Sequence, residues 1–186
     1  MILYIHGFNS SAQSGKAREM GAWMAERGMG DQYLCPDLPD RPAEAIALLE
    51  SLLAPHLGTA PITLIGSSLG GFYATYLAEK HDLKAVLVNP CVSCHKKLAL
   101  MLDQPQKNWH TGAEYVFSIA HLAELQPLAV TPNRLQNYLL LVETGDAVLD
   151  YLEAVEFYAG ARQEVREGGD HGFTRFAEYL PMILEF

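Results

Sequence analysis

A serine with a glycine two residues away on either side lies in the sequence G-S-S-L-G-G at residues 66–71. It follows the apolar run 61–65 and precedes a helix-patterned segment that ends near Lys80. A serine at a sharp strand-to-helix turn has a strained backbone and needs small neighbours so that the chains can pass each other. Its hydroxyl then points out of the sheet, and the next amide begins a helix. The pattern predicts that Ser68 is a nucleophile.

Two alternatives compete with this interpretation. The G-x-S-x-G pattern also arises by chance in a chain with 15 glycines, and residues 66–71 would then be only a tight turn. Ser67 could be the nucleophile instead, but Ile65 occupies the position two residues before it, where the turn needs glycine. We therefore expect Ser67 to be structural.

A serine nucleophile requires a base that accepts its proton and an acid that orients the base. On this architecture the expected chain order is serine, acid, histidine. His171 fits the base, because G-G-D-H-G at 168–172 is a loop just after the last predicted strand. The other histidines lack such a loop, belong to a cysteine cluster or precede Ser68: His6, His56, His81, His95, His110 and His121.

Asp146 is the predicted triad acid, because T-G-D-A-V at 144–148 directly follows the strongest apolar run, 138–142. The alternative role is a cap for a helix that begins near Ala147. Asp150 and Asp170 remain competing acids. The first falls inside the predicted helix, and the second adjoins the histidine that it would have to orient.

The oxyanion of an acyl-transfer intermediate needs backbone donors, one of them from the loop after the first strand. His6-Gly7-Phe8-Asn9-Ser10-Ser11 occupies that loop. We expect the Phe8 and Leu69 N–H groups to donate together, with the His6 side chain bracing the loop. The alternative is an ordinary polar turn.

The composition fits one globular domain over residues 1–186, since 49% of the residues are hydrophobic. The formal net charge is −9, and Lys96-Lys97 is the only adjacent basic pair, so nucleic acid is not an expected partner. The first residues have no basic leader, and their apolar run is too short for a signal-peptide core or a membrane span. We expect a cytoplasmic protein without a membrane span.

The sequence C-V-S-C-H at residues 91–95 matches the attachment pattern of a c-type haem. No export signal accompanies it, and it directly follows a predicted buried strand, so haem is not expected. A closed zinc site needs four ligands, and Cys35 has no second partner at finger spacing. We expect reduced, partly buried thiols, with no metal and no cofactor.

Apolar runs alternate with 3.6-period segments along the chain, which predicts an α/β protein with a mainly parallel sheet covered by helices on both faces. The six expected strands are Ile2–His6, Gln32–Pro36, Ile62–Gly66, Ala85–Asn89, Tyr138–Glu143 and Arg162–Arg166. A further helix is expected to carry Val148, Tyr151, Leu152 and Val155 on one buried stripe.

Between Asn89 and Tyr138 lie 48 residues, far more than a crossover requires. Within this excursion, residues 114–125 show helical spacing of Val116, Ile119, Ala120 and Ala123. We interpret residues 91–135 approximately as a small helical cap over the catalytic face. The alternative is an ordinary helical pair at the sheet edge.

The chain resembles the α/β-hydrolase superfamily and, more closely, the small YqiA-like bacterial esterases. The resemblance runs almost end to end and rests on stretches at 3–11, 66–71, 88–90, 111–116, 144–151 and 168–174. It implies Ser68, Asp146 and His171 as the triad, a cytoplasmic location and esterase activity toward acyl esters or thioesters. The chain departs from the family at Cys91–His95, where the family has a stretch without cysteine.

The leading hypothesis is a metal-independent serine hydrolase that forms an acyl-enzyme intermediate on a small acyl ester or thioester. A small serine peptidase is the alternative within the hydrolases, because the elbow does not encode the leaving group. A binding protein that keeps the α/β-hydrolase fold without catalysis is the alternative from another class.

Overall fold

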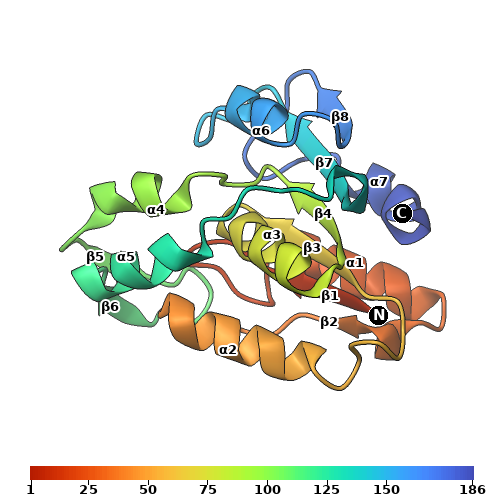
Figure 1. The fold of residues 1–186 in the computed structure, drawn as a ribbon, viewed down its shortest axis with the longest axis horizontal. Helices are drawn as coiled ribbons and strands as arrows, with labels where there is room; N and C mark the ends of the chain where they lie inside the picture. The colour runs from red at the N-terminus through yellow and green to blue at the C-terminus, as the bar shows by residue number, and fades with distance from the viewer.

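Six strands form the main sheet of the computed structural model, which describes all residues 1–186 (Figure 1). Their order is β2-β1-β3-β4-β7-β8, and every neighbouring pair is parallel. The strands are β1 Ile2–Ile5, β2 Tyr33–Leu34, β3 Thr63–Ser67, β4 Lys84–Val88, β7 Tyr138–Glu143 and β8 Arg162–Arg166. The predicted sheet is confirmed, although the edge strand β2 is shorter than expected. The prediction extended this strand to Pro36, but proline has no backbone N–H that could donate a hydrogen bond to the neighbouring strand.

Helices cover both faces of this sheet, as predicted. They are α1 Gly15–Glu26, α2 Pro42–Leu53, α3 Leu69–His81, α4 Cys94–Lys97, α5 Ile119–Leu125, α6 Tyr151–Phe157 and α7 Phe176–Glu185. Short 3₁₀ turns are η1 Gly30–Gln32, η2 Leu98–Met101, η3 Gln126–Leu128 and η4 Leu135–Asn137.

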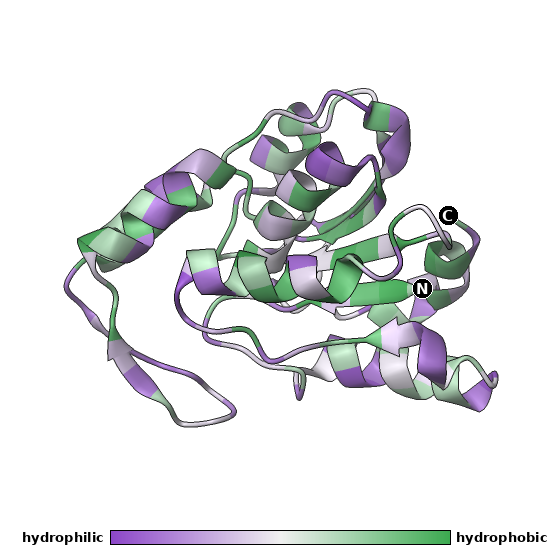
Figure 2. Cartoon of the chain, turned by 60° about the horizontal axis from the view of Figure 1, so that its bottom comes forward, coloured by the Kyte–Doolittle hydropathy of each residue, from purple (hydrophilic) through white to green (hydrophobic).

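The strands are buried on both sides because their side chains alternate between two cores. In β1, Leu3 and Ile5 join the core under α2 and α3, whereas Ile2 and Tyr4 join the core under α1 and α7. Continuous apolar strands of this kind are typical of parallel sheets. Figure 2 shows the resulting hydrophobic colour along the central strands.

The excursion between β4 and β7 is only partly helical. It contains α4, α5 and a hairpin of β5 Pro105–Lys107 with β6 Glu114–Val116, and it lies at one end of the molecule in Figure 1. The prediction of a helix over 114–125 was therefore wrong for residues 114–116, which form a strand, and the helix begins only at Ile119. Val116 and Ile119 are exposed, whereas His121 and Leu125 are buried, so the buried face of α5 differs from the predicted stripe.

The helix after β7 also begins later than its apolar pattern indicated. It starts at Tyr151, with Asp150 as its N-cap. Val148 and Leu152 are exposed, and Tyr151 and Val155 pack against the core. Two of the four residues in the predicted stripe thus face solvent.

The carboxyl ends of β1, β3, β7 and β8 meet at one edge of the sheet, because all strands run in the same direction. The strand order reverses between β1 and β3, and a crevice beside such a reversal is the usual ligand site of an open parallel sheet. No helix has both the length and the apolar character required to cross a lipid bilayer.

Candidate active site

Ser68 lies at the turn between β3 and α3, with φ 55° and ψ −120°. Residues other than glycine rarely adopt positive φ, so this turn is strained. Gly66 and Gly70 are required here, because a Cβ at Gly66 would collide with the Gly70 carbonyl and one at Gly70 with the carbonyl of Ile5. The close packing of α3 on β1 and β3 therefore depends on the two glycines that flank Ser68.

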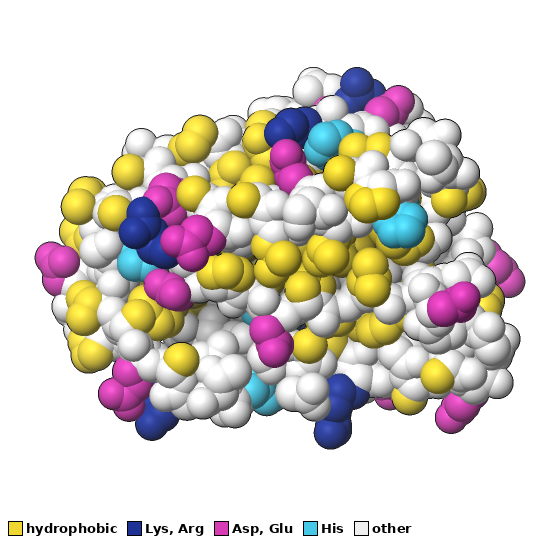
Figure 3. Space-filling model, turned by 90° about the horizontal axis from the view of Figure 1, so that it is seen from below, with side chains coloured by type: hydrophobic (Ala, Val, Ile, Leu, Met, Phe, Trp, Pro, Cys, Tyr) yellow, Lys and Arg dark blue, Asp and Glu magenta, His cyan; other side chains and the backbone are white.

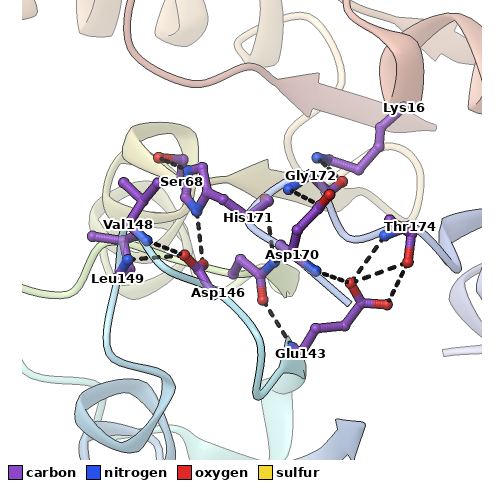
Figure 4. Close-up of polar contacts among 11 residues, drawn as sticks. Lys16, Ser68, Glu143, Asp146, Val148, Leu149, Asp170, His171, Gly172 and Thr174 are labelled. Carbon is purple, nitrogen blue, oxygen red and sulfur yellow. Dashed lines mark hydrogen bonds and ion pairs between the residues drawn. The ribbon is translucent and has the colours of Figure 1, made fainter. Parts of the chain in front are cut away.

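The side chains of Ser68, His171 and Asp146 form a continuous chain of hydrogen bonds (Figure 4). The Ser68 Oγ is 3.1 Å from His171 Nε2, and His171 Nδ1 is 2.7 Å from Asp146 Oδ2. Because a carboxylate only accepts, Nδ1–H donates to Asp146, which leaves Nε2 to accept from the Ser68 hydroxyl. The structure thus brings together three predicted residues that are distant in the sequence.

The Asp146 carboxylate is almost fully enclosed, with 2% of its side chain exposed. Its second oxygen, Oδ1, accepts from the Val148 and Leu149 N–H groups at 2.8 and 2.9 Å. Burial acts to raise the Asp146 pKa, but the hydrogen bonds from His171 and these two amides outweigh it, so the pKa lies below its ordinary value. Asp146 is therefore ionised at neutral pH.

The competing residues have other partners. Asp150 accepts from Leu152 N–H and caps α6, and Asp170 accepts from Gly172 N–H within its own loop. Neither carboxylate makes a hydrogen bond to the His171 ring. Ser67 is buried as the last residue of β3.

Phe8 and Leu69, the predicted oxyanion donors, line the same cavity, and Leu69 directly follows Ser68. Leu69 is the first residue of α3, so its N–H has no acceptor within the helix. The hydrogen bonds of the loop after β1 do not use the Phe8 N–H. Gly7 brings this loop against the elbow, since a Cβ there would lie 3.7 Å from the Ser68 Oγ. Both amides are therefore available as donors beside Ser68.

His6 fixes the start of that loop. Its Nε2 accepts from Leu38 N–H at 3.0 Å, and its Nδ1 lies 3.0 Å from the Gly7 carbonyl. Burial lowers the His6 pKa, which favours the neutral ring with its proton on Nδ1. The ring braces the loop after β1 as expected.

The cavity beside the two amides has a volume of 240 Å³. Its polar walls include Asn9, Asn108, Thr111 and Tyr115, and three carboxylates also line it, from Asp37, Asp40 and Glu114. No lysine or arginine lines it. Apolar side chains such as those of Phe8, Leu38 and Leu69 also line it, so its inner surface combines apolar area with neutral hydrogen-bonding groups and acidic residues.

Asn9, which follows Phe8, is held by the β5–β6 hairpin, a contact that the sequence analysis missed. Tyr115 Oη–H donates to Asn9 Oδ1 at 2.8 Å, Asn9 Nδ2 donates to Gln106 Oε1 at 3.0 Å, and Trp109 N–H donates to the Asn9 carbonyl at 2.9 Å. Asn9 also has a φ of 54°. The excursion thus contacts the loop that contains one of the predicted oxyanion donors.

Two further buried polar residues lie beside the His171 loop and were not singled out from the sequence. Glu143 is the last residue of the apolar strand β7, and Asn89 directly follows β4. A polar residue that ends an otherwise apolar strand was the available signal.

Cys91 and Cys94 are free thiols buried in the larger core, and burial raises the Cys94 pKa well above its ordinary value. The His95 ring packs against Phe72. No group of three or more His, Cys, Asp or Glu side chains is arranged as a metal site. The cysteines are therefore part of the hydrophobic packing beneath α4.

A family model described as "Uncharacterised protein family (UPF0227)" matches residues 1–186. Similar solved structures include the alpha/beta hydrolase domain-containing protein 10 from mouse, with 12% identity, a TM-score of 0.73 and coverage of 99% of this chain and 89% of that one. Est1E from Butyrivibrio proteoclasticus has 15% identity, a TM-score of 0.68 and coverage of 100% and 85%. The methylesterase MES16 from Arabidopsis has 14% identity, a TM-score of 0.68 and coverage of 100% and 99%. At these identities the similarity shows the fold, which is that of the α/β hydrolases.

Proposed function

The chain belongs to the family UPF0227 and has the α/β-hydrolase fold, and on this basis we propose that it is a serine hydrolase of small acyl esters or thioesters. The observation that carries the proposal is the chain of hydrogen bonds from Ser68 through His171 to Asp146 at the carboxyl edge of the sheet. A methylesterase among the similar structures is consistent with ester cleavage.

In the proposed reaction, Ser68 Oγ attacks the acyl carbonyl carbon while its proton passes to His171 Nε2. Asp146 holds the Nδ1–H and stabilises the imidazolium that forms. The carbonyl oxygen becomes an oxyanion that accepts from the Phe8 and Leu69 amides. Collapse of this intermediate expels the alcohol or thiol, which takes the proton from His171. Water then repeats the sequence on the acyl-enzyme and releases the acid.

The cavity beside Phe8 and Leu69 is proposed to take one side of the substrate. Its volume of 240 Å³ is below the range of about 300–1,000 Å³ usual for drug-sized ligands, which favours a small acyl or alcohol group. Residues of the β5–β6 hairpin form one wall. We propose on that ground that the segment 91–135 acts as a cap.

The decisive variants are Ser68→Ala and His171→Ala, assayed on a small chromogenic ester. Each is expected to lower kcat by about 10⁶, because the triad acts as a unit. Thermal unfolding should show that both variants keep the fold. A Ser68→Ala protein that cleaves the ester at the parental rate would overturn the proposal.

Labelling with a fluorophosphonate separates an enzyme from a binding protein. The hydrolase proposal expects stoichiometric modification of Ser68 and none in Ser68→Ala, because only an activated serine reacts. An unlabelled parent protein would favour a non-catalytic binding protein. Competition of labelling by esters, thioesters and short peptides then identifies the substrate class, and protection by peptides alone would favour a peptidase.

A further inference from the structure

Glu143 is completely buried at the carboxyl end of β7, three residues before Asp146. Its Oε2 accepts from the Asp170 and Thr174 N–H groups, both at 3.0 Å, and its Oε1 accepts from Thr174 Oγ1–H at 3.2 Å. In the sequence these donors precede and follow His171, and Figure 4 shows both of them next to the Glu143 carboxylate. One carboxylate therefore forms hydrogen bonds with the loop both before and after His171.

Asn89 complements Glu143 by holding the carbonyl groups of the same loop. Its Nδ2 donates to the Asp170 and His171 carbonyls at 3.0 and 3.2 Å, and its Oδ1 accepts from Glu143 N–H at 3.0 Å. Asn89 thus joins the end of β7 to the backbone of His171 itself. Lys16 of α1 donates to the Gly172 carbonyl at 2.6 Å from a third direction.

The loop depends on hydrogen bonds to other segments because it forms no strand or helix of its own. Gly168 and Gly169 have φ values of 77° and 71°, and no strand or helix forms between β8 and α7. A buried carboxylate is also expensive to desolvate, and an apolar side chain would end an apolar strand at lower cost. Core packing does not explain why a glutamate occupies position 143. The hydrogen-bond donors of the His171 loop do, because they need a buried acceptor.

We propose that Glu143 is a positioning residue that sets the distance from His171 Nε2 to Ser68 Oγ. This inference rests on the proposed hydrolase function. A displacement of about 1 Å in a catalytic group can cost about 10² in rate, so loss of the tie acts mainly on kcat. The substrate cavity does not include Glu143, and KM should therefore change little.

The test compares Glu143→Ala, Glu143→Gln and Glu156→Ala on a small chromogenic ester. Glu143→Ala is expected to lower kcat by about 10–10², with KM within about twofold of the parent. Glu143→Gln is expected to restore most of kcat, because its amide oxygen can accept from both N–H groups and its NH₂ can donate to Thr174 Oγ1. Glu156→Ala removes an exposed carboxylate from α6 and serves as the matched control.

The rate of fluorophosphonate labelling at Ser68 provides a second readout, since it depends on the same base. It should fall in parallel with kcat in Glu143→Ala. An unchanged kcat in a folded Glu143→Ala protein overturns the proposal, and so does a Glu143→Gln protein as impaired as Glu143→Ala. If Glu143→Ala does not fold, Thr174→Val removes the Oγ1–H donor that the exposed residue Thr174 supplies to the carboxylate, and parental kcat in that variant overturns the proposal.

Failure of the underlying function gives a different result. If Ser68→Ala retains full activity, the hydrolase assignment fails whatever Glu143 does. If Ser68→Ala is inactive and Glu143→Ala matches the parent, only the positioning role fails.

Discussion

At the residue scale, four carboxylates occur near His171 in sequence or in space, and their hydrogen bonds give each a different role. Asp146 accepts from the ring, Asp150 caps a helix, Asp170 closes its own turn, and Glu143 holds the loop. Only the first can orient the imidazole tautomer. The sequence leaves open which acid orients His171. The structure answers this by which carboxylate points at the ring, and closeness in the sequence does not decide it.

Asp146→Asn tests this distinction. The amide can still accept from Val148 and Leu149 N–H through Oδ1, but the NH₂ that replaces Oδ2 cannot accept from His171 Nδ1–H. We expect kcat on a chromogenic ester to fall by about 10⁴, because the wrong tautomer is favoured. Asp150→Ala is the control, and it should lose about 1 kcal/mol of unfolding free energy through its helix cap while kcat is retained. The opposite pattern would make Asp150 the acid.

At the element scale, the β5–β6 hairpin and the loop after β1 form one unit. Every polar group of the Asn9 side chain is bonded to the hairpin, and Asn108 Nδ2 also donates to the Ser10 carbonyl at 2.7 Å. The pairing is antiparallel between Gln106 and Tyr115, so both side chains reach the same residue. The hairpin therefore fixes the backbone next to the Phe8 amide.

Tyr115→Phe removes one of these ties with almost no change in volume. We expect kcat to fall, because the Phe8 amide is held less firmly. The fall should be smaller than the factor of about 10² to 10³ that complete loss of an oxyanion donor typically costs, since the amide itself is still present. Tyr151→Phe, at the start of α6, is the matched control. Steady-state kinetics on a chromogenic ester measure the effect. Equal kcat in both variants would show that the hairpin does not influence the oxyanion site.

At the scale of the whole molecule, negative charge surrounds the proposed substrate cavity. The net charge is −9, acidic side chains are spread over the face shown in Figure 3, and three acidic residues line the cavity without a lysine or arginine among them. Lys107 pairs with Glu114 at 3.2 Å and offsets its charge, whereas neither Asp37 nor Asp40 is paired with a lysine or an arginine. The molecule should therefore repel anionic substrates on approach.

The repulsion predicts a salt effect that depends on the charge of the substrate. For an ester with a carboxylate on its acyl group, kcat/KM should rise as salt increases from about 10 mM to about 100 mM, over which the Debye length falls from about 30 Å to about 10 Å. A neutral ester of similar size should show almost no change. Glu114→Gln should reduce the effect. If the anionic ester is favoured at low salt, a local cationic group must dominate the cavity.

The sequence by itself determined the sheet and the identity of the residues at its edge. Apolar runs require burial on both faces, and the glycines around Ser68 allow only a close strand-to-helix turn, so local chemistry was sufficient for these features. Tertiary structure alone decided which acid faces His171, that 114–116 pairs as a strand, and that Glu143 and Asn9 hold the two loops beside Ser68. The spacing of apolar residues in the sequence indicates which side of a helix or strand is buried. That spacing does not indicate which polar groups of distant segments form hydrogen bonds with each other, and those hydrogen bonds define this site.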